Sequence, residues 1–518
     1  MKIALQPASS SGFGRSHQWH NNTHPKWWKD SGLRRNVGWV VALYLSVFAL
    51  GYDGSLMSGL QALPQWNEYF NNPSGARLGL IVASLTIPVI IVAPLTSWCL
   101  DKFGRKITVS LGSFILIVGP LIGSFAQNDA MLIIGRVLVG GASFFTSIAC
   151  ACHVNELLHP RIRGVFSALF TTTLQVGSII GSWVTFGTLR WQSNWSWRLP
   201  LLLQAIGPAI LFPLSFFCPE SPRWLVKKGE KQKAHKILAR YHANGDLDDD
   251  LVKNELHQIV AAIEREEKER SSWKALLSTP GNRRRTLLVA VINTGPVMTG
   301  LTIVWGYLVP TLRLVGINNP TELVGISGGF AIAQAIGCMI GALCVDFLGR
   351  RPIFLISTTA MLILFSVLTV LMAVFSHNPL PAIGIAYVVI LYLFGFFLNF
   401  GWVALAALYP PEILPFSLRA KGMALGTFLQ SICSSFNTFV NPIALEAIGW
   451  KYYTVYIAVI AIYLGLLWVF LVETKGRTIE EIVELFDGSQ TQLVSEEDSQ
   501  GEVFEAKKST HEVIEVND

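Results

Sequence analysis

The sequence predicts an all-α membrane protein with about twelve spanning helices in two related halves. Hydrophobic residues make up 51% of the 518-residue chain and charged residues only 14%, whereas soluble chains average about 25% charged residues. The few charges are clustered, which leaves apolar stretches of the roughly 20 residues that cross a bilayer core. A third observation is a charge motif that occurs twice. Helices are expected because they satisfy their own backbone hydrogen bonds in lipid.

Twelve apolar segments fall into two groups of six. They cover residues 38–60, 78–100, 107–126, 131–153, 165–188 and 198–217, and then 286–309, 322–345, 352–375, 381–408, 422–446 and 452–472. We therefore expect five parts: a cytosolic tail (1–37), a six-helix half (38–217), a cytosolic helical linker (218–285), a second six-helix half (286–472) and a cytosolic tail (473–518).

Basic residues set the expected orientation. The loops after the second, fourth, eighth and tenth segments hold most of the loop arginines and lysines, and the Lys/Arg-rich side is cytoplasmic. Both termini are then cytosolic, and the net charge of +6 needs no nucleic-acid partner. Residues 1–35 have no apolar core, so we expect no cleavable signal peptide. Asn194 begins a glycosylation sequon on the expected outer side, where we expect it to stay unmodified.

The repeated motif has the form Asp-x-x-Gly-Arg-basic. It occupies residues 101–106 after the second segment and residues 346–351 after the eighth. Two further pairs recur in register: a Glu before an Arg-rich turn after the fourth and tenth segments, and a Glu followed by Arg after the sixth and twelfth. Three pairs in register indicate an internal duplication. Two such halves with a site between them are a transporter plan.

The charges of these motifs are candidates for a cytoplasmic gate. Carboxylates and guanidiniums can pair bidentately across adjacent helix ends, and pairs that form only when the cytoplasmic side is closed would act as a lock. The alternative is that these charges only anchor helices and set orientation. The candidates are Asp101, Arg105, Glu156, Arg163, Glu220, Arg223, Asp346, Arg350, Glu412, Arg419, Glu473 and Arg477.

Together these motifs make the chain resemble the sugar-porter branch of the major facilitator superfamily over nearly its whole length. Matching stretches are residues 51–57, 61–66, 135–136, 219–223, 409–412, 419–422 and 473–478. Residues 441–445 and 449–453 resemble the fungal lactose-permease-like group, beside the hexose transporters. The resemblance implies the major facilitator fold, with twelve transmembrane helices as two six-helix halves, and a plasma-membrane location.

Asp53 is an acid inside an apolar segment, and such residues are functional candidates by default. Arg136 lies near the start of the fourth segment. In proton-coupled sugar porters, an acid and an arginine at these positions form the coupling pair, so the resemblance implies proton symport with Asp53 as the carrier. The alternative is a fixed structural ion pair.

The resemblance also implies a set of substrate contacts. Gln175 aligns with a sugar-contacting glutamine, and amides can both donate and accept hydrogen bonds. For Gln334, Asn399 and Asn437, a helix–helix hydrogen bond is an equally good interpretation. Tyr307 is what remains of a family tyrosine pair. Trp305 and Trp402 could each supply an aromatic surface on which a substrate stacks, or their side chains could face lipid. We favour the position facing lipid.

The seventh segment departs from the family pattern. Val297, Met298 and Leu301 stand where the family carries glutamines and an asparagine, and an unpaired buried hydroxyl costs about 1–3 kcal/mol. Three functions therefore remain open: a sugar:proton symporter for lactose, hexose or a related sugar, a transporter of a non-sugar organic molecule such as a secondary metabolite, and a non-transporting sugar sensor.

Enzymatic activity is not expected, because the chain has no P-loop, HExxH or nucleophile-elbow motif. We expect no cofactor and no metal site, since Cys150 and Cys152 are two apart on a helix and do not share a face. The expected partners are a small-molecule substrate, protons and the lipid bilayer, with no nucleic acid and a monomeric chain.

Overall fold

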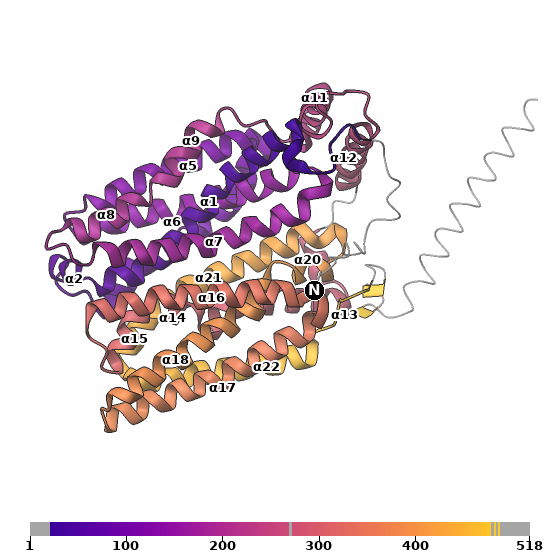
Figure 1. The fold of residues 1–518 in the computed structure, drawn as a ribbon. Coiled ribbons are helices and arrows are strands. Elements are labelled where there is room, and N and C mark those ends of the chain that lie inside the picture. Colours follow the sequence, from indigo (N-terminus) through magenta and orange to yellow (C-terminus); the bar gives the residue numbers. More distant parts are fainter. Residues whose placement is uncertain (1–20, 269–271, 478–480, 483–484, 487–518) are drawn as a thin grey trace, which may run out of the picture.

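The molecule is a bundle of long helices, and no strand occurs in the residues described. The computed structural model describes residues 21–268, 272–477, 481–482 and 485–486. Figure 1 shows the helices that precede the linker on one side of the bundle and those that follow it on the other. We call the end at which α11 (Lys231–His242) and α12 (Asp250–Lys268) lie the linker end, and the opposite end the far end.

The first side is built from residues 27–215. Its elements are η1 (Trp27–Lys29), α1 (Ser31–Ala62), α2 (Pro64–Tyr69), α3 (Gly75–Ala83), α4 (Val89–Phe103), α5 (Arg105–Ser124), α6 (Asp129–Leu157), α7 (Pro160–Thr188), α8 (Trp195–Leu203) and α9 (Ile206–Ser215). The linker adds α10 (Pro222–Lys227), α11, α12 and η2 (Trp273–Leu277). Polar caps start several of these helices: the Asn128 side chain, for example, accepts from Met131 N at 2.9 Å.

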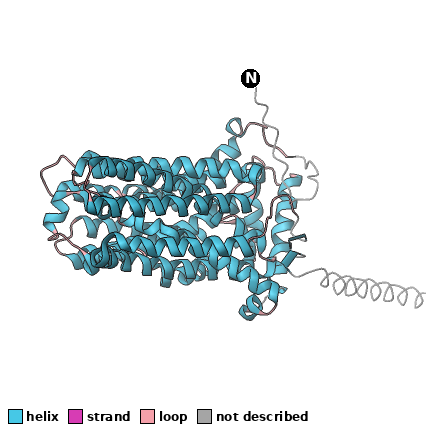
Figure 2. Ribbon diagram, turned by 90° about the horizontal axis from the view of Figure 1, so that it is seen from below, coloured by secondary structure: helices cyan, strands magenta, loops and turns pink. Residues whose placement is uncertain are grey.

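The second side is built from residues 280–470. Its elements are α13 (Pro280–Pro296), η3 (Val297–Leu301), α14 (Thr302–Gly306), α15 (Leu308–Leu314), α16 (Pro320–Leu348), α17 (Arg350–His377), α18 (Pro381–Leu398), η4 (Asn399–Val403), α19 (Ala404–Ala406), α20 (Tyr409–Ile413), α21 (Phe416–Ile448), η5 (Gly449–Tyr452) and α22 (Tyr453–Phe470). Figure 2 shows the long helices running alongside one another, with shorter helices gathered at one end.

Within the described residues, ten helical stretches are long and apolar enough to cross a membrane. The last of them, Ser417–Phe470, has 54 residues and contains two of the expected segments, α21 and α22. The expected segment 78–100 is missing from the ten because it is broken into α3 and α4 by a turn that ends at Pro88. The twelve predicted segments are recovered when α21 and α22 are counted separately and the broken segment 78–100 is added.

Two of the long helices are interrupted by π-helical turns, which often mark functional sites. The first, η3, contains Gly300 at φ 119°, a left-handed conformation that favours glycine. The second, η4, begins at Asn399. Both interruptions therefore coincide with residues that the sequence analysis associates with substrate.

The outside of the bundle is apolar. Ile91, Phe217 and Phe347 are 73%, 75% and 80% exposed, and other large apolar side chains on the outer helix faces are exposed as well. A soluble surface would not present so many of them together, so this surface fits the lipid contact that the sequence predicts.

The two sides of the bundle meet along α7 and α16 and along α3 and α21. At the far end they are joined by hydrogen bonds: Gln61 Nε2 donates to Gly306 O at 2.9 Å, and Arg313 Nη2 donates to Gln61 O at 3.2 Å. Ser74 Oγ donates to Glu446 Oε1 at 3.2 Å. The far end is therefore closed in this conformation.

Candidate functional site

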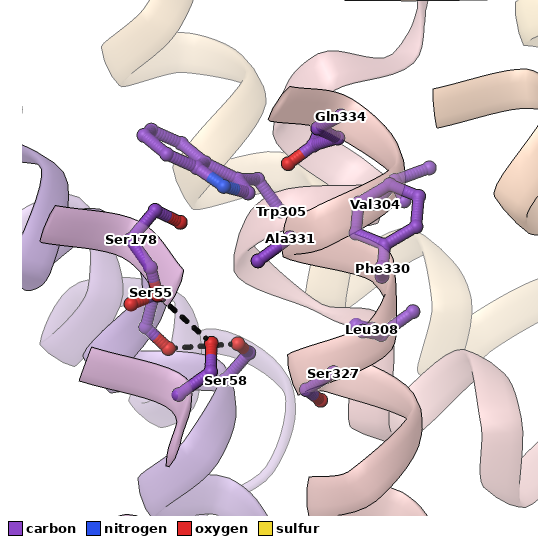
Figure 3. Close-up of a pocket in the computed structure, with 11 residues that line it drawn as sticks. Ser55, Ser58, Ser178, Val304, Trp305, Leu308, Ser327, Phe330, Ala331 and Gln334 are labelled. Carbon is purple, nitrogen blue, oxygen red and sulfur yellow. Dashed lines mark hydrogen bonds between the residues drawn. The ribbon is translucent and has the colours of Figure 1, made fainter. Parts of the chain in front are cut away.

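A small cavity lies between the two sides of the bundle. Its volume is about 10 Å³, close to the space that one water needs. Four serines of α1 and α7 line one wall, while α14, α15 and α16 supply a mostly apolar wall (Figure 3). The lining residues are Ser55, Ser58, Ser178, Ser182, Val304, Trp305, Leu308, Ser327, Phe330, Ala331 and Gln334.

The serine wall consists of Ser55, Ser58, Ser178 and Ser182. Ser58 Oγ donates to Ser55 O at 2.9 Å, and Ser182 Oγ donates to Ser178 O at 3.1 Å. The buried Ser178 Oγ has no hydrogen-bond partner. A hydroxyl that donates still has lone pairs that can accept, so this wall can bind a hydroxylated molecule. These serines were not among the predicted site residues, although their spacing of three and four residues places each pair on one helix face.

The opposite wall combines aromatic, aliphatic and amide groups. Trp305 lies against α1, where a Cβ added to Gly54 would come within 2.4 Å of its ring. Figure 3 shows Trp305, Phe330 and Gln334 across the cavity from Ser55 and Ser58. Gln334 lines the cavity, and its contact with substrate stays a prediction. The expectation that Trp305 faces lipid is wrong, because the missing side chain at Gly54 lets its ring enter the interface.

Trp402 does not face lipid either. Its side chain is fully buried, and its Nε1 donates to Thr358 Oγ1 at 3.1 Å. A Cβ at Gly295 would come within 1.9 Å of its ring, so the glycine makes room for it. Trp402 therefore fills the core of the second side, and it does not line the cavity in this conformation.

Gln175 and Asn399 meet across the interface. Gln175 Nε2 donates to Asn399 Oδ1 at 3.1 Å, and Asn399 Nδ2 donates to Gly395 O at 3.0 Å. Both side chains are buried. In this conformation the two amides form a helix–helix contact. Their contact with substrate stays a prediction, and it requires the two sides to separate so that this hydrogen bond breaks.

Asn437 and Tyr307 make helix–helix hydrogen bonds in this conformation. Asn437 Nδ2 donates to Val297 O at 3.1 Å and lies 3.3 Å from Met298 Sδ. The Tyr307 hydroxyl donates to Thr438 O. Both residues tie the interrupted seventh segment to α21, which is the alternative role that the sequence analysis left open for Asn437.

Asp53 and Arg136 are both buried, at 2% and 4% exposure, and each acts on the other through its charge. Arg136 Nε donates to Ile81 O at 2.8 Å. Asp53 Oδ2 and Arg136 Nη2 have no hydrogen-bond partner, and the described structure gives no salt bridge between the two side chains. Gln204 lies beside the Asp53 carboxylate. The sequence analysis missed Gln204, whose only signal was a lone amide in an apolar segment.

The repeated motif forms a clamp in the first half at the linker end. Arg105 donates from Nε and Nη2 to the two carboxylate oxygens of Glu156, both at 2.7 Å. Glu220 accepts from the backbone N–H groups of Arg105 and Lys106 at 2.9 and 3.2 Å, where a helix N-terminus favours an anion. Gly104, at φ 88°, makes the turn before α5.

The second half repeats this clamp residue for residue. Arg350 donates from Nε and Nη2 to Glu412 at 3.2 and 2.9 Å. Glu473 accepts from the backbone N–H groups of Arg350 and Arg351, both at 2.9 Å. Gly349 has φ 89°. Each clamp joins helices within one half, so in this conformation the motifs brace the halves individually.

The remaining gate candidates have varied surroundings. Asp101 accepts from Lys227 Nζ at 2.9 Å, and Arg163 Nη2 donates to Leu158 O at 3.1 Å. Arg419 Nε is buried without a hydrogen-bond partner, while Arg477 is exposed. Arg223 lies in the first turn of α10. The side chain of Asp346 falls outside the described part of the chain.

A buried histidine–glutamate pair holds the linker onto the bundle. His242 Nδ1 and Glu255 Oε2 are 2.6 Å apart, and His242 Nε2 lies 3.0 Å from Leu157 O. Burial opposes the charge of His242, but Glu255 outweighs it and raises the pKa of His242 above its usual value. Burial also acts on Glu255, whose pKa is nevertheless lowered by His242. Burial lowers the pKa of the neighbouring His159 to about 3.

We expect His242→Gln to loosen the linker. Removing one partner leaves Glu255 buried without its counter-charge, and breaking a buried pair costs about 3–5 kcal/mol; 12% exposure of the Glu255 side chain places the expected loss at the lower end. Because the pKa of His242 is raised, the pair's stabilisation is present below pH 6.5 and is lost as the pH rises through that raised pKa. Below pH 6.5, the amide protection of α12 against hydrogen exchange should be lower in the His242→Gln protein than in the wild type, and this difference should disappear as the pH rises through the raised pKa of His242.

The matched control is Lys253→Gln, on the same helix as Glu255. It removes an exposed pair with Asp248, which precedes that helix. Exposed pairs contribute little to stability because water screens their charges, so exchange in α12 should hardly change. Unchanged exchange in the His242→Gln protein would contradict this account of the linker.

In the described residues, no group of three or more His, Cys, Asp or Glu side chains is placed to hold a metal ion.

Comparison with known proteins places this geometry in a family. The sequence model of the family described as "Sugar (and other) transporter" matches residues 39–486. A high-affinity glucose transporter of Kluyveromyces lactis is 27% identical, over 87% of this chain and 84% of its own. An MFS-type transporter of Aspergillus cristatus, criB, is 27% identical over 86% of this chain and 92% of its own.

Solved structures agree on the fold. The inward-open xylose transporter XylE from E. coli superposes with a TM-score of 0.72, covering 87% of this chain and 99% of its own, at 19% identity. XylE bound to 6-bromo-6-deoxy-D-glucose superposes with a TM-score of 0.68 at 20% identity. The fold is therefore the major facilitator fold, and the matched proteins are membrane transporters, not enzymes.

Proposed function

This multi-pass membrane protein belongs to the sugar (and other) transporter family, and on that premise we propose that it carries sugars across the membrane as a secondary transporter. The observation that carries the proposal is the serine wall of the cavity between the two halves. Ser55, Ser58, Ser178 and Ser182 present hydroxyls opposite Trp305, and a sugar has both hydroxyls and an apolar ring face. The cavity of about 10 Å³ is too small for a sugar, so the halves must separate to admit one.

Transport then follows alternating access, in which one half rocks against the other about the site. The hydrogen bonds of Gln61, Arg313 and Glu446 close the far end, and opening that end requires them to break. The Gln175–Asn399 bond would yield to substrate hydroxyls at the centre. The clamps of Arg105 and Arg350 would keep each half rigid while it moves. Both termini and the linker are cytosolic in this proposal, and the membrane is the plasma membrane.

Proton symport fits the burial of Asp53 beside Arg136. Asp53 is the acid that can take up a proton, and its Oδ2 has no hydrogen-bond partner. Taking a charge out of water is costly unless it is paired, so movement of Arg136 away from Asp53 would favour protonation. Substrate and proton would thus be carried by the same conformational change, with Asp53 as the proton carrier.

A second candidate is a transporter of a less hydroxylated molecule, such as a secondary metabolite. It is favoured by the apolar wall of Val304, Leu308 and Phe330 and by the loss of family amides at Val297 and Met298. The valine side chain at position 297 cannot form hydrogen bonds with a substrate, and the backbone carbonyl of Val297 accepts from Asn437.

Uptake by vesicles reconstituted with the purified protein separates the two candidates. The substrate panel holds glucose, xylose, lactose and several apolar metabolites, each tested with and without a proton gradient. Saturable sugar uptake that the gradient increases supports the proposal. Uptake of an apolar metabolite alone favours the second candidate and rejects sugar transport.

A further inference from the structure

A larger cavity lies at the far end of the interface. Its volume is about 280 Å³, near the lower limit of about 300 Å³ for small-molecule sites. Residues from α1 to α3 form one side, and residues of α15 and α21 form the other. It shares no lining residue with the serine-walled cavity, so it is a separate site.

Two polar atoms among its lining residues are buried and unpaired. They are Trp66 Nε1, on a fully buried side chain, and Gln61 Oε1, on a side chain that is 3% exposed. Buried polar groups in native proteins nearly always have a partner. The first atom needs an acceptor and the second needs a donor, and a hydroxyl group can serve as either once the side chains that cover these two atoms shift to admit it.

The charges around the cavity balance. Arg313 and Glu446 bring one charge of each sign. A ligand that carries a single charge would be attracted by one of them and repelled by the other. Leu78, Leu445 and Pro442 add apolar walls. A neutral molecule with hydroxyl groups and an apolar face matches this lining.

The cavity is present in the conformation in which the far end is closed. The same residues that line it make the hydrogen bonds between the halves, Arg313 to Gln61 and Ser74 to Glu446. A ligand here would touch both halves and bind the closed conformation alone. Binding then shifts the population toward that conformation, which slows any cycle that must open the far end.

We propose that the far-end cavity is a second binding site, which takes a neutral hydroxylated molecule with an apolar face and thereby inhibits transport. Phenyl β-D-glucopyranoside has this chemistry and serves as the probe. If the serine-walled cavity also binds the probe, the wild-type protein takes up two probes per chain; if it does not, the wild-type protein takes up one. The far-end site and the proposed sugar site can therefore fail independently.

The deciding variant is Trp66→Phe, which keeps an aromatic ring and removes the N–H. We expect the far-end affinity to fall about tenfold, as measured by equilibrium binding to protein in lipid nanodiscs. Trp197→Phe is the matched control. Trp197 is also fully buried with an unpaired Nε1, but it packs on Tyr69 and Phe70 and should leave binding unchanged.

A second variant covers the case in which Trp66→Phe does not fold. Leu78→Phe adds ring atoms in the cavity, where there is room for them, and should reduce far-end binding at least as strongly. Loss of one bound probe in either variant, with the Trp197→Phe protein unchanged, supports the proposal. Absence of probe binding to the wild-type protein, or the same binding in Trp66→Phe and Leu78→Phe as in wild type, overturns it.

Discussion

Replacing Asp53 with asparagine is expected to abolish accumulation of substrate driven by a proton gradient, while exchange of substrate down its own gradient continues. The amide has nearly the shape of the carboxyl group but cannot take up a proton. Asp53 is 2% exposed and feels the charge of Arg136, so the substitution removes the protonatable group from this buried place. Accumulation in vesicles should fall from many-fold to equality with the outside concentration.

Asp129→Asn is the control for Asp53→Asn. Asp129 pairs with Arg77 in an exposed salt bridge at 2.5 Å, and such pairs are worth about 0–1 kcal/mol. Its loss should leave accumulation as in the wild type. Full gradient-driven accumulation by the Asp53→Asn protein would reject Asp53 as proton carrier and leave it a structural partner of Arg136.

Replacing Gly51 with alanine should destabilise the first half by about 3 kcal/mol or more. Its added Cβ would lie 1.9 Å from Leu174 O and 2.8 Å from Leu174 C. Overpacking typically costs about 1–3 kcal/mol, and here the obstacle is backbone, which cannot rotate away as a side chain can. Close helix contacts through small residues are how membrane helices pack. Thermal unfolding of the purified protein in detergent measures the loss.

Gly38→Ala on the same helix provides the control. A Cβ at Gly38 meets no atom within 4 Å, and alanine is a better helix former than glycine by about 1 kcal/mol. This variant should unfold at the wild-type temperature or slightly above. Equal unfolding temperatures for the Gly51→Ala and Gly38→Ala proteins would contradict the close packing of α1 on α7.

The fold could be predicted because its signals are local in the sequence. Apolar length alone marks the helices that cross a bilayer, and the duplicated motif marks matching places in the two halves. The paired clamps of Arg105 with Glu156 and Arg350 with Glu412 follow from that register. What local signals missed was the break between α3 and α4, because a turn ending at Pro88 can lie inside an apolar run without changing its hydropathy.

The candidate site was harder to predict because it depends on which way each helix faces. Trp305 was expected to face lipid and lies against Gly54, since hydropathy does not distinguish an apolar interface from lipid. The serines escaped notice because serine is common in membrane helices, where its hydroxyl usually bonds to its own helix. Only the packing of α1 and α7 against α14 and α16 brings Ser55 and Ser178 to one cavity.

Alternating access requires the far end to open and close. Ser74 and Glu446 lie on opposite halves there, with Oγ and Oε1 3.2 Å apart. Cysteines at both positions, joined by a short cleavable cross-linker, would hold that end closed. The controls are each single-cysteine variant and the wild type, which already contains seven cysteines, all treated with the same reagent.

Vesicle uptake by the cross-linked Ser74→Cys/Glu446→Cys protein is the most direct test of alternating access. We expect transport to fall to the level of empty vesicles and to return when the cross-linker is cleaved, while the control proteins transport throughout. Transport at the wild-type rate with the cross-link demonstrably in place would contradict the account, because substrate would then pass without the far end opening.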